Sequence, residues 1–246
     1  MRRETGKEVV IMEKSLDNLF AKYGITCYAS QREKLERYMQ LVLDKNENLN
    51  LTAIEDTSEF IVKHFLDSAI LLSIGEYETA REILDMGTGG GFPGVPLAIL
   101  SPEKDFLLID SLKKRIRAVS EMTAQIGLSN VRVMHGRAEE LARLEEFRDR
   151  FDMCVSRAVA DLSTLAEYCL PFVKKSGHFI AYKSGEVEAE LSDARPAIAA
   201  LEGKFVRTEN IDIEGNTRTL LLFTKTSVTP DRFPRRAGKP LKTPIK

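Results

Sequence analysis

A glycine-rich stretch at residues 83–94 constrains the fold of this chain more than any other feature. It reads Ile-Leu-Asp-Met-Gly-Thr-Gly-Gly-Gly-Phe-Pro-Gly, so an apolar run ends beside an acid and five glycines follow within eight residues. Glycine tolerates positive φ and lets bare backbone approach a ligand, and Pro93 suits the first turn of a helix. The pattern predicts a strand at about 82–86, a loop that binds a nucleotide-type cofactor, and a helix at about 94–100.

Two registers of this loop are possible. A G-x-G-x-x-G run that begins at Gly89 matches the fingerprint of dinucleotide-binding proteins. Because the strand should stop at Met86, we favour a register that resembles the acid-x-Gly-x-Gly-x-Gly loop of S-adenosylmethionine (SAM) methyltransferases, with Phe92 directly after it. A SAM site holds no pyrophosphate, so an acid near the cofactor's ammonium group is more useful than a helix dipole. In this register the predicted cofactor residues are Asp85, Gly87, Gly89 and Gly91. NAD(P) binding and a purely structural loop remain as alternatives.

Composition limits the class of protein. At 246 residues the chain can form one α/β domain and an extension, and 36 basic against 37 acidic residues mean that any polyanion must bind a local patch. No apolar run has the length of a signal-peptide core or a membrane span. The cysteines and histidines are dispersed, without metal-binding spacing: Cys27, Cys154, Cys169, His64, His135 and His178. We therefore expect a cytoplasmic protein with reduced cysteines, no metal and no membrane partner.

Residues 1–80 have helical periodicity. Apolar residues recur at helical spacing from Met12 to Tyr23, from Leu35 to Val42, and on two faces of residues 57–73. Gly24 is a predicted helix stop. We expect a helical N-terminal extension that packs on the core.

From residue 82 onward, strand patterns alternate with helix patterns. The predicted strands are 82–86, 105–110, 131–135, 151–156 and 178–183, and the further predicted helices are 112–126, 161–170 and 186–202. We expect Ser111 to be the N-cap of the first of these helices. Two last β segments, 204–213 and 217–225, are joined by a turn that only antiparallel strands can use. This order predicts a Rossmann-like α/β core over residues 81–225, with a seven-stranded, mostly parallel sheet and one antiparallel strand. It resembles class I SAM methyltransferases rather than the all-parallel dehydrogenases.

Polar residues follow the predicted strands at the edge where ligands of such sheets bind. Asp110 ends the second strand, with Ser111 beside it, and a carboxylate there can accept hydrogen bonds from both hydroxyls of a ribose. After the third strand, the N–H of Ala138 and the carboxylate of Glu139 could bind the edge of adenine. The alternatives are a helix-capping role for Asp110 and a dipole-favoured helix acid at Glu139.

The end of the fourth strand limits the acceptor chemistry. Enzymes that methylate exocyclic amines of bases usually carry Asn/Asp-Pro-Pro-aromatic there, and this chain has Ser156-Arg157-Ala158. Cys154 lies inside the strand, so we expect a core residue rather than a nucleophile. Arg157 and Lys183 remain as cations that could position a substrate, with surface ion pairs as the alternative. Such a rim suits an acceptor that needs no general base, such as guanine N7.

Longer motifs resemble one known family. The bacterial small-subunit ribosomal RNA (guanine-N7) methyltransferase G family, also called glucose-inhibited division protein B, is similar over nearly the whole chain. The motifs are Asn48–Ala53, Lys63–Ser68, Asp85–Pro96, Asp110–Leu112, Ser156–Ala158 and Pro234–Arg236. The resemblance implies a monomeric enzyme that uses SAM to methylate N7 of a guanine in the 530 loop of 16S rRNA, within the small ribosomal subunit. It places cofactor contacts at Gly87, Phe92, Ala138, Glu139 and Arg157.

The last 21 residues, 226–246, differ from the core. They carry six basic residues against one acid, Asp231, and four prolines that argue against regular structure. A solvated tail and a flexible phosphate-binding arm are both possible. A ribosome-binding protein with a relic cofactor loop is the non-enzymatic alternative for the whole chain.

Overall fold

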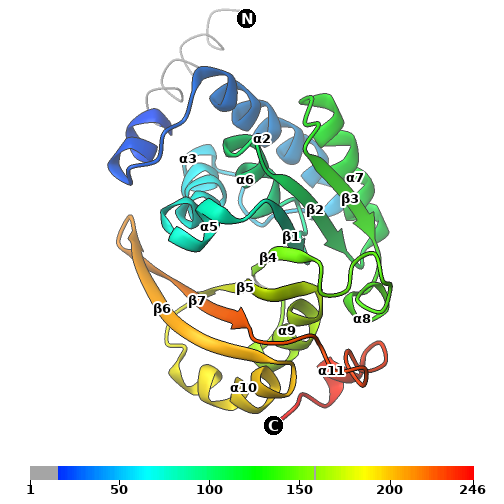
Figure 1. Cartoon of the computed structure of the whole chain (residues 1–246). Helices are drawn as coiled ribbons and strands as arrows, with labels where there is room; N and C mark the ends of the chain where they lie inside the picture. The colour runs from blue at the N-terminus through cyan, green and yellow to red at the C-terminus, as the bar shows by residue number, and fades with distance from the viewer. Residues whose placement is uncertain (1–15, 158) are drawn as a thin grey trace, which may run out of the picture.

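A seven-stranded sheet forms the centre of the molecule (Figure 1). The computed structural model describes residues 16–157 and 159–246. The sheet order is β3-β2-β1-β4-β5-β7-β6. Neighbouring strands from β3 to β5 are parallel, whereas β7 pairs antiparallel with both β5 and β6. The strands are β1 Glu82–Met86, β2 Asp105–Asp110, β3 Val131–His135, β4 Phe151–Arg157, β5 Val173–Ser184, β6 Gly203–Ile213 and β7 Asn216–Lys225. The predicted mixed sheet with one antiparallel strand is confirmed.

Helices cover both faces of the sheet, and successive strand residues alternate between two cores. On β4, Val155 packs with the N-terminal helices, whereas its neighbour Cys154 packs with α9 and α10 and is fully buried, as predicted. The helices that follow the strands are α6 Gly94–Leu100, α7 Lys113–Gln125, α8 Ala138–Leu141, α9 Leu162–Cys169, η3 Leu170–Phe172, α10 Glu188–Ala200 and α11 Lys239–Lys242.

The N-terminal part is helical wherever it is described. Residues 16–22 form a helix, and the run predicted at 57–73 is continuously helical. Within that run, residues 61–66 form a π-helix, a distortion that is often found at functional sites. The elements are α2 Ala29–Leu49, α3 Thr57–Phe60, η1 Ile61–Leu66, α4 Asp67–Ala69, η2 Ile70–Ser73 and α5 Gly75–Thr79. Met12, predicted in the first helix, lies outside the described residues.

Two local predictions are wrong. Ser111 is not the N-cap of α7; the cap is Leu112, because the Asp110 carboxylate binds the N–H of Leu112 at 2.8 Å and starts the helix one residue later. Residues 226–246 are not devoid of regular structure either. Pro240 lies in the first turn of α11, where its missing N–H removes no helical bond, and Phe233 and Pro240 are buried.

None of the helices in the described part of the chain has the length and apolar character needed to cross a membrane.

Candidate functional site

The glycine loop after β1 has the strained backbone that its sequence predicts. Gly87, Gly89 and Gly91 have φ of 74°, 58° and 92°, values that L side chains rarely adopt. The N–H groups of Gly87 and Thr88 both donate to the carbonyl of Ile109, at 2.8 and 3.0 Å. The loop is therefore fastened across the ends of β1 and β2, with its backbone at the rim of the sheet.

Asp85 stabilises the loop by accepting hydrogen bonds from two of its residues. Its fully buried carboxylate accepts hydrogen bonds through Oδ2 from the Thr88 hydroxyl at 2.6 Å and the Gly94 N–H at 2.8 Å. Oδ1 is buried without a hydrogen-bond partner among the described residues. Burial raises the pKa of this carboxyl to about 6. Asp85 organises the loop in this structure, and direct contact with a cofactor ammonium stays a prediction.

A cavity of about 260 Å³ lies over the ends of β1, β2 and β3. It brings together Gly87, Asp110, Ser111, Ala138 and Glu139, five of the predicted cofactor residues, and adds Arg115 and Tyr168, which were not predicted. Phe92, Asp85, Gly89 and Gly91 lie in or below the loop and do not line it. The topology therefore gathers residues 87–139 into one pocket.

The residues of this cavity fit a nucleoside. The Asp110 carboxylate accepts one backbone hydrogen bond at each oxygen, from Gly89 at 3.0 Å and from Leu112, which leaves a lone pair on each for a diol. Glu139 is buried at 3% exposure, and the N–H of Ala138 lies in the first turn of α8, where helical N–H groups have no intrahelical partner. A Cβ on Gly87 would come 2.4 Å from Val159 at the same wall.

A second cavity, of about 670 Å³, lies over the other half of the rim, at the ends of β4 and β5 and the start of β7. Its charged lining residues are Lys63, Asp67, Arg157 and Arg218. Asp67 is fully buried; its Oδ2 binds Nη1 of Arg157 at 2.5 Å and its Oδ1 binds Nε of Arg218. Two guanidinium groups share one carboxylate, so the wall of this cavity carries net positive charge.

His64 joins this cluster to the glycine loop. Its ring stacks on Phe92, with centroids 4.2 Å apart and planes at 8°, and its Nδ1 lies 3.1 Å from Nη2 of Arg157. Burial and then the charges of Arg157 and Lys63 lower the pKa of His64 to about 3, so the ring is neutral. Since Arg157 can only donate, Nδ1 accepts and Nε2–H donates to the Thr52 hydroxyl at 2.7 Å.

Lys183 is not brought to either cavity. Its Nζ binds Glu190 of α10 at 2.6 Å and the carbonyl of Ala160 at 3.1 Å. Arg157, in contrast, points to the second cavity rather than the first. Sequence reasoning missed Asp67 as the partner of Arg157, and Arg218 as the second arginine on that carboxylate. An acid within the apolar helical run 57–73 was the available signal.

The sheet order, the glycine loop after β1 and the carboxylate at the end of β2 define the class I SAM-dependent methyltransferase fold. Two solved structures support this class by fold alone. A SAM-dependent methyltransferase from Aquifex aeolicus has a TM-score of 0.51 at 15% identity and covers 71% of this chain and 97% of its own. The YcgJ protein of Bacillus subtilis has a TM-score of 0.50 at 14% identity, covering 67% and 99%.

Within that class, the chain belongs to the family described as GidB, rRNA small subunit methyltransferase G, whose model matches residues 31–219. A relative named ribosomal RNA small subunit methyltransferase G from Lachnoclostridium phytofermentans is 46% identical over 90% of this chain and 93% of its own length. One of the same name from Lactococcus lactis subsp. cremoris is 43% identical over 91% and 95%. The predicted family is confirmed, and with it SAM as the cofactor and ribosomal RNA methylation as the general activity.

Within residues 16–157 and 159–246, no group of three or more His, Cys, Asp or Glu side chains could hold a metal ion.

Proposed function

We propose that this protein transfers the methyl group of SAM to N7 of a guanine in the 530 loop of 16S rRNA. It would act as a monomer in the cytoplasm, on the small ribosomal subunit. The first cavity, with Asp110, Ser111, Ala138 and Glu139, would hold the nucleoside part of the cofactor. SAM supplies an electrophilic methyl group on a sulfonium. The second cavity, with Arg157, would receive the guanine.

The observation that carries this proposal is the state of the two possible bases beside the second cavity. The Asp67 carboxylate is shared by Arg157 and Arg218, and the lone pair of His64 Nδ1 faces the guanidinium of Arg157. Neither group is placed to take a proton from a substrate. Guanine N7 has a free lone pair and loses no proton on methylation, so alignment and charge suffice. Alignment alone is worth about 7–11 kcal/mol in favourable cases.

Arginine at this rim also fits the acceptor. A guanidinium donates in a fixed fork to the oxygen edge of a base or to a phosphate. Arg218 has an Nη2 that makes no hydrogen bond to another described residue and lines the cavity with 24% of its side chain exposed. We propose that it binds the nucleotide while Arg157 is held by Asp67 and His64. Lys183 stays a weaker candidate for substrate positioning, because Glu190 already binds it.

The decisive experiment is nucleoside mass spectrometry of 16S rRNA from cells with and without the gene. Loss of one 7-methylguanosine is expected, and an unchanged amount would refute the proposal. Complementation with Gly87→Asp should leave the site unmethylated, because its Cβ would meet Val159 at 2.4 Å. Gly24→Asp is the matched control, since Gly24 has φ of 69° with open space around it. A ribosome-binding protein with a relic loop predicts that Gly87→Asp keeps full cellular function.

A thermal-shift assay distinguishes SAM from the rival cofactor, NAD(P). S-adenosylhomocysteine should raise the melting temperature of the protein, whereas NADH should not. Stabilisation by NADH alone would favour an oxidoreductase and contradict the proposed function.

A further inference from the structure

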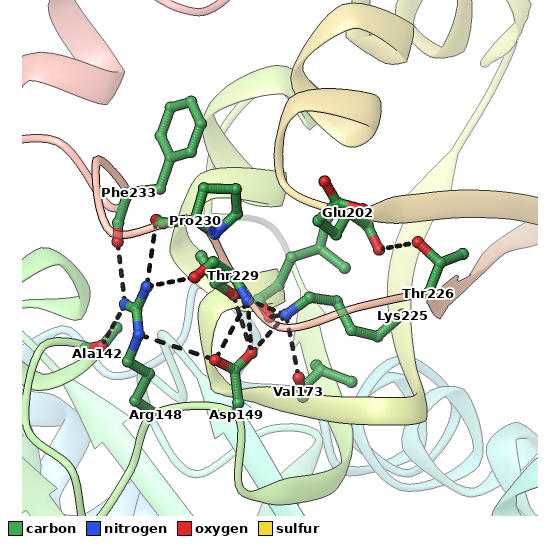
Figure 2. Close-up of polar contacts among 11 residues, drawn as sticks. Ala142, Arg148, Asp149, Val173, Glu202, Lys225, Thr226, Thr229, Pro230 and Phe233 are labelled. Atoms are coloured by element: carbon green, nitrogen blue, oxygen red, sulfur yellow. Dashed lines mark hydrogen bonds and ion pairs between the residues drawn. The ribbon is translucent and has the colours of Figure 1, made fainter.

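The C-terminal strap, which we define as residues 226–246, packs on helices beside the first cavity. We call this cavity the cofactor cavity, because the proposed function assigns it to the nucleoside part of SAM. The strap lies beyond residues 31–219, the part matched by the family model. Figure 1 shows it running beside α9 toward α8, and α11 contacts α9. Figure 2 shows the Arg148 guanidinium pointing at strap carbonyls; it donates to those of Thr229 at 2.8 Å, Pro230 at 3.2 Å and Phe233 at 2.9 Å. The strap is therefore fixed to the body of the protein over much of its length.

A buried lysine anchors the beginning of the strap. Lys225 Nζ donates to Asp149 Oδ1 at 2.7 Å and to the Thr229 hydroxyl at 2.6 Å (Figure 2). It also donates to the carbonyls of Leu170 and Val173. Burial lowers the pKa of Lys225, while the Asp149 carboxylate opposes that shift. Since its hydrogen bonds are satisfied inside the protein, this cluster sets where the strap starts.

The strap then reaches two buried carboxylates beside the cofactor cavity. Arg235 binds Glu167 through its backbone N–H at 2.6 Å, its Nη2 at 2.6 Å and its Nε at 3.0 Å. Glu167 precedes Tyr168, which lines the cavity. Three residues beyond Arg235, the N–H of Gly238 donates to Oε1 of Glu139 at 2.7 Å.

The hydrogen bond from Gly238 satisfies one of the two carboxylate oxygens of Glu139, Oε1. Its Oε2 makes no hydrogen bond with another residue of the described ranges, although the side chain is 3% exposed and lines the cavity. Nη2 of Arg137 lies 3.6 Å from Oε1 of the same carboxylate. A carboxylate held at one oxygen presents the other in a fixed direction, ready to accept from an amino group.

We propose that the C-terminal strap is a positioning element for the cofactor. Gly238 and Arg235 hold Glu139 and the α8–α9 wall so that Oε2 of Glu139 is ready for the exocyclic amino group of adenine. This inference rests on the proposed function, which assigns Glu139 to the cofactor. The strap acts on binding of the adenosine part and takes no part in methyl transfer.

A double-mutant cycle tests whether the strap acts on the cofactor through Glu139. Calorimetry gives the Kd of each protein for S-adenosylhomocysteine and for adenosine. The four proteins are the wild type, a chain ending at Pro230, Glu139→Gln, and the combination. The shortened chain keeps Lys225 and Thr229. We expect each single change to weaken both ligands about tenfold, the size of one charge-assisted hydrogen bond. The combination should also be about tenfold weaker, because both changes remove the same interaction. KM for SAM should rise while kcat at saturation stays within about twofold.

Two full-length variants control for folding. Arg235→Gln keeps the strap but loosens its anchor, and should weaken binding by an intermediate factor only when Glu139 is present. Arg236→Gln/Lys242→Gln changes exposed strap cations and should leave both Kd values unchanged. Circular dichroism checks that each variant is folded.

The outcomes separate the two proposals. Unchanged affinity in Glu139→Gln would refute the assignment of Glu139 to the cofactor, and the strap inference with it. A tenfold loss in Glu139→Gln with no loss in the shortened chain would overturn the strap inference alone. Losses that multiply to about a hundredfold in the combination would also overturn the strap inference, because the two changes would then act independently.

Discussion

Alanine substitutions at two glycines of the loop should lower the free energy of unfolding by different amounts. Gly91 has φ of 92°, and a Cβ added there would lie 2.0 Å from the Tyr38 hydroxyl and 2.8 Å from Val95. Gly89 has a similar backbone, φ of 58°, but its nearest neighbour would be 4.0 Å away. The two alanine substitutions therefore share the backbone strain and differ in the clash.

The expected magnitudes follow from these distances. Backbone strain at a positive φ costs about 1 kcal/mol for a non-glycine residue, and overpacking a buried site adds about 1–3 kcal/mol. Gly89→Ala should lower the free energy of unfolding by about 1 kcal/mol. Gly91→Ala should lower it by about 3 kcal/mol, the sum of both costs. Urea unfolding followed by circular dichroism measures the difference.

Tyr38 supplies an internal check on the cause. Its hydroxyl donates to the carbonyl of Gly90 at 2.7 Å, so Tyr38→Phe alone should cost about 1 kcal/mol. In the Gly91→Ala background the same change removes the clashing oxygen, and the nearest ring carbon would lie at 3.1 Å. There it should be neutral or stabilising. If Gly91→Ala and Gly89→Ala differ by less than about 0.5 kcal/mol, or if Tyr38→Phe costs the same in both backgrounds, the packing argument is wrong.

Three further predictions concern the rim and the strap. Arg157→Ala should lower kcat/KM about a hundredfold, because Asp67 and His64 lose the cation that they hold at the second cavity, while the protein stays folded; retained activity in a methylation assay would remove Arg157 from the site. His64 has a folded pKa of about 3, below its ordinary 6.5, so the unfolded state binds the proton first and stability falls as pH drops from 6.5 toward 3. Between pH 6.5 and 5 the wild type should lose about 1–2 kcal/mol more than His64→Gln in urea unfolding, and equal losses would contradict the neutral ring. The strap should also contribute salt-sensitive RNA affinity: Arg236→Gln/Lys242→Gln should flatten the slope of log K against log salt by about 0.9 for each phosphate that is no longer neutralised, and an unchanged slope would argue against this role.

The central fold could be predicted because its strands carry strong local signals. β1 and β2 begin and end where the apolar runs do, since the central strands of a parallel sheet are buried on both faces. β3 lies at the edge of the sheet and is only partly buried, and it too has the predicted bounds. β5 begins at Val173, five residues before the predicted start at His178. The extra residues include Ser176, at φ of 66°, and are partly polar and exposed. Of these residues only Val173 has a strand partner, Phe151, and a register shift separates this pair from the next one, Met153 with His178. No local pattern indicates such an interrupted pairing.

The candidate site likewise contains residues that the sequence could place and residues that it could not. Asp110, at the end of β2, and Glu139, in the helix just after β3, could be placed because parallel strands end at one rim. The partners of Arg157 could not, because Asp67 is 90 residues away and lies on the N-terminal helices. Lys183 shows the limit of the strand-end rule. Its neighbour Tyr182 points to the N-terminal face and binds the carbonyl of Ser68, so Lys183 points to the opposite face and meets Glu190.

Asp67 explains why the N-terminal helices matter for the second cavity, the proposed acceptor site. A fully buried carboxylate is costly unless charged partners compensate its lost hydration, and here the compensation comes from Arg157 on β4 and Arg218 on β7. Packing the helices therefore brings the two arginines together, although their strands lie on either side of β5 in the sheet. Without Asp67 the two cations would repel each other across the second cavity. The helical extension is thus part of the proposed acceptor site, because it supplies the carboxylate that lets two arginines share that site.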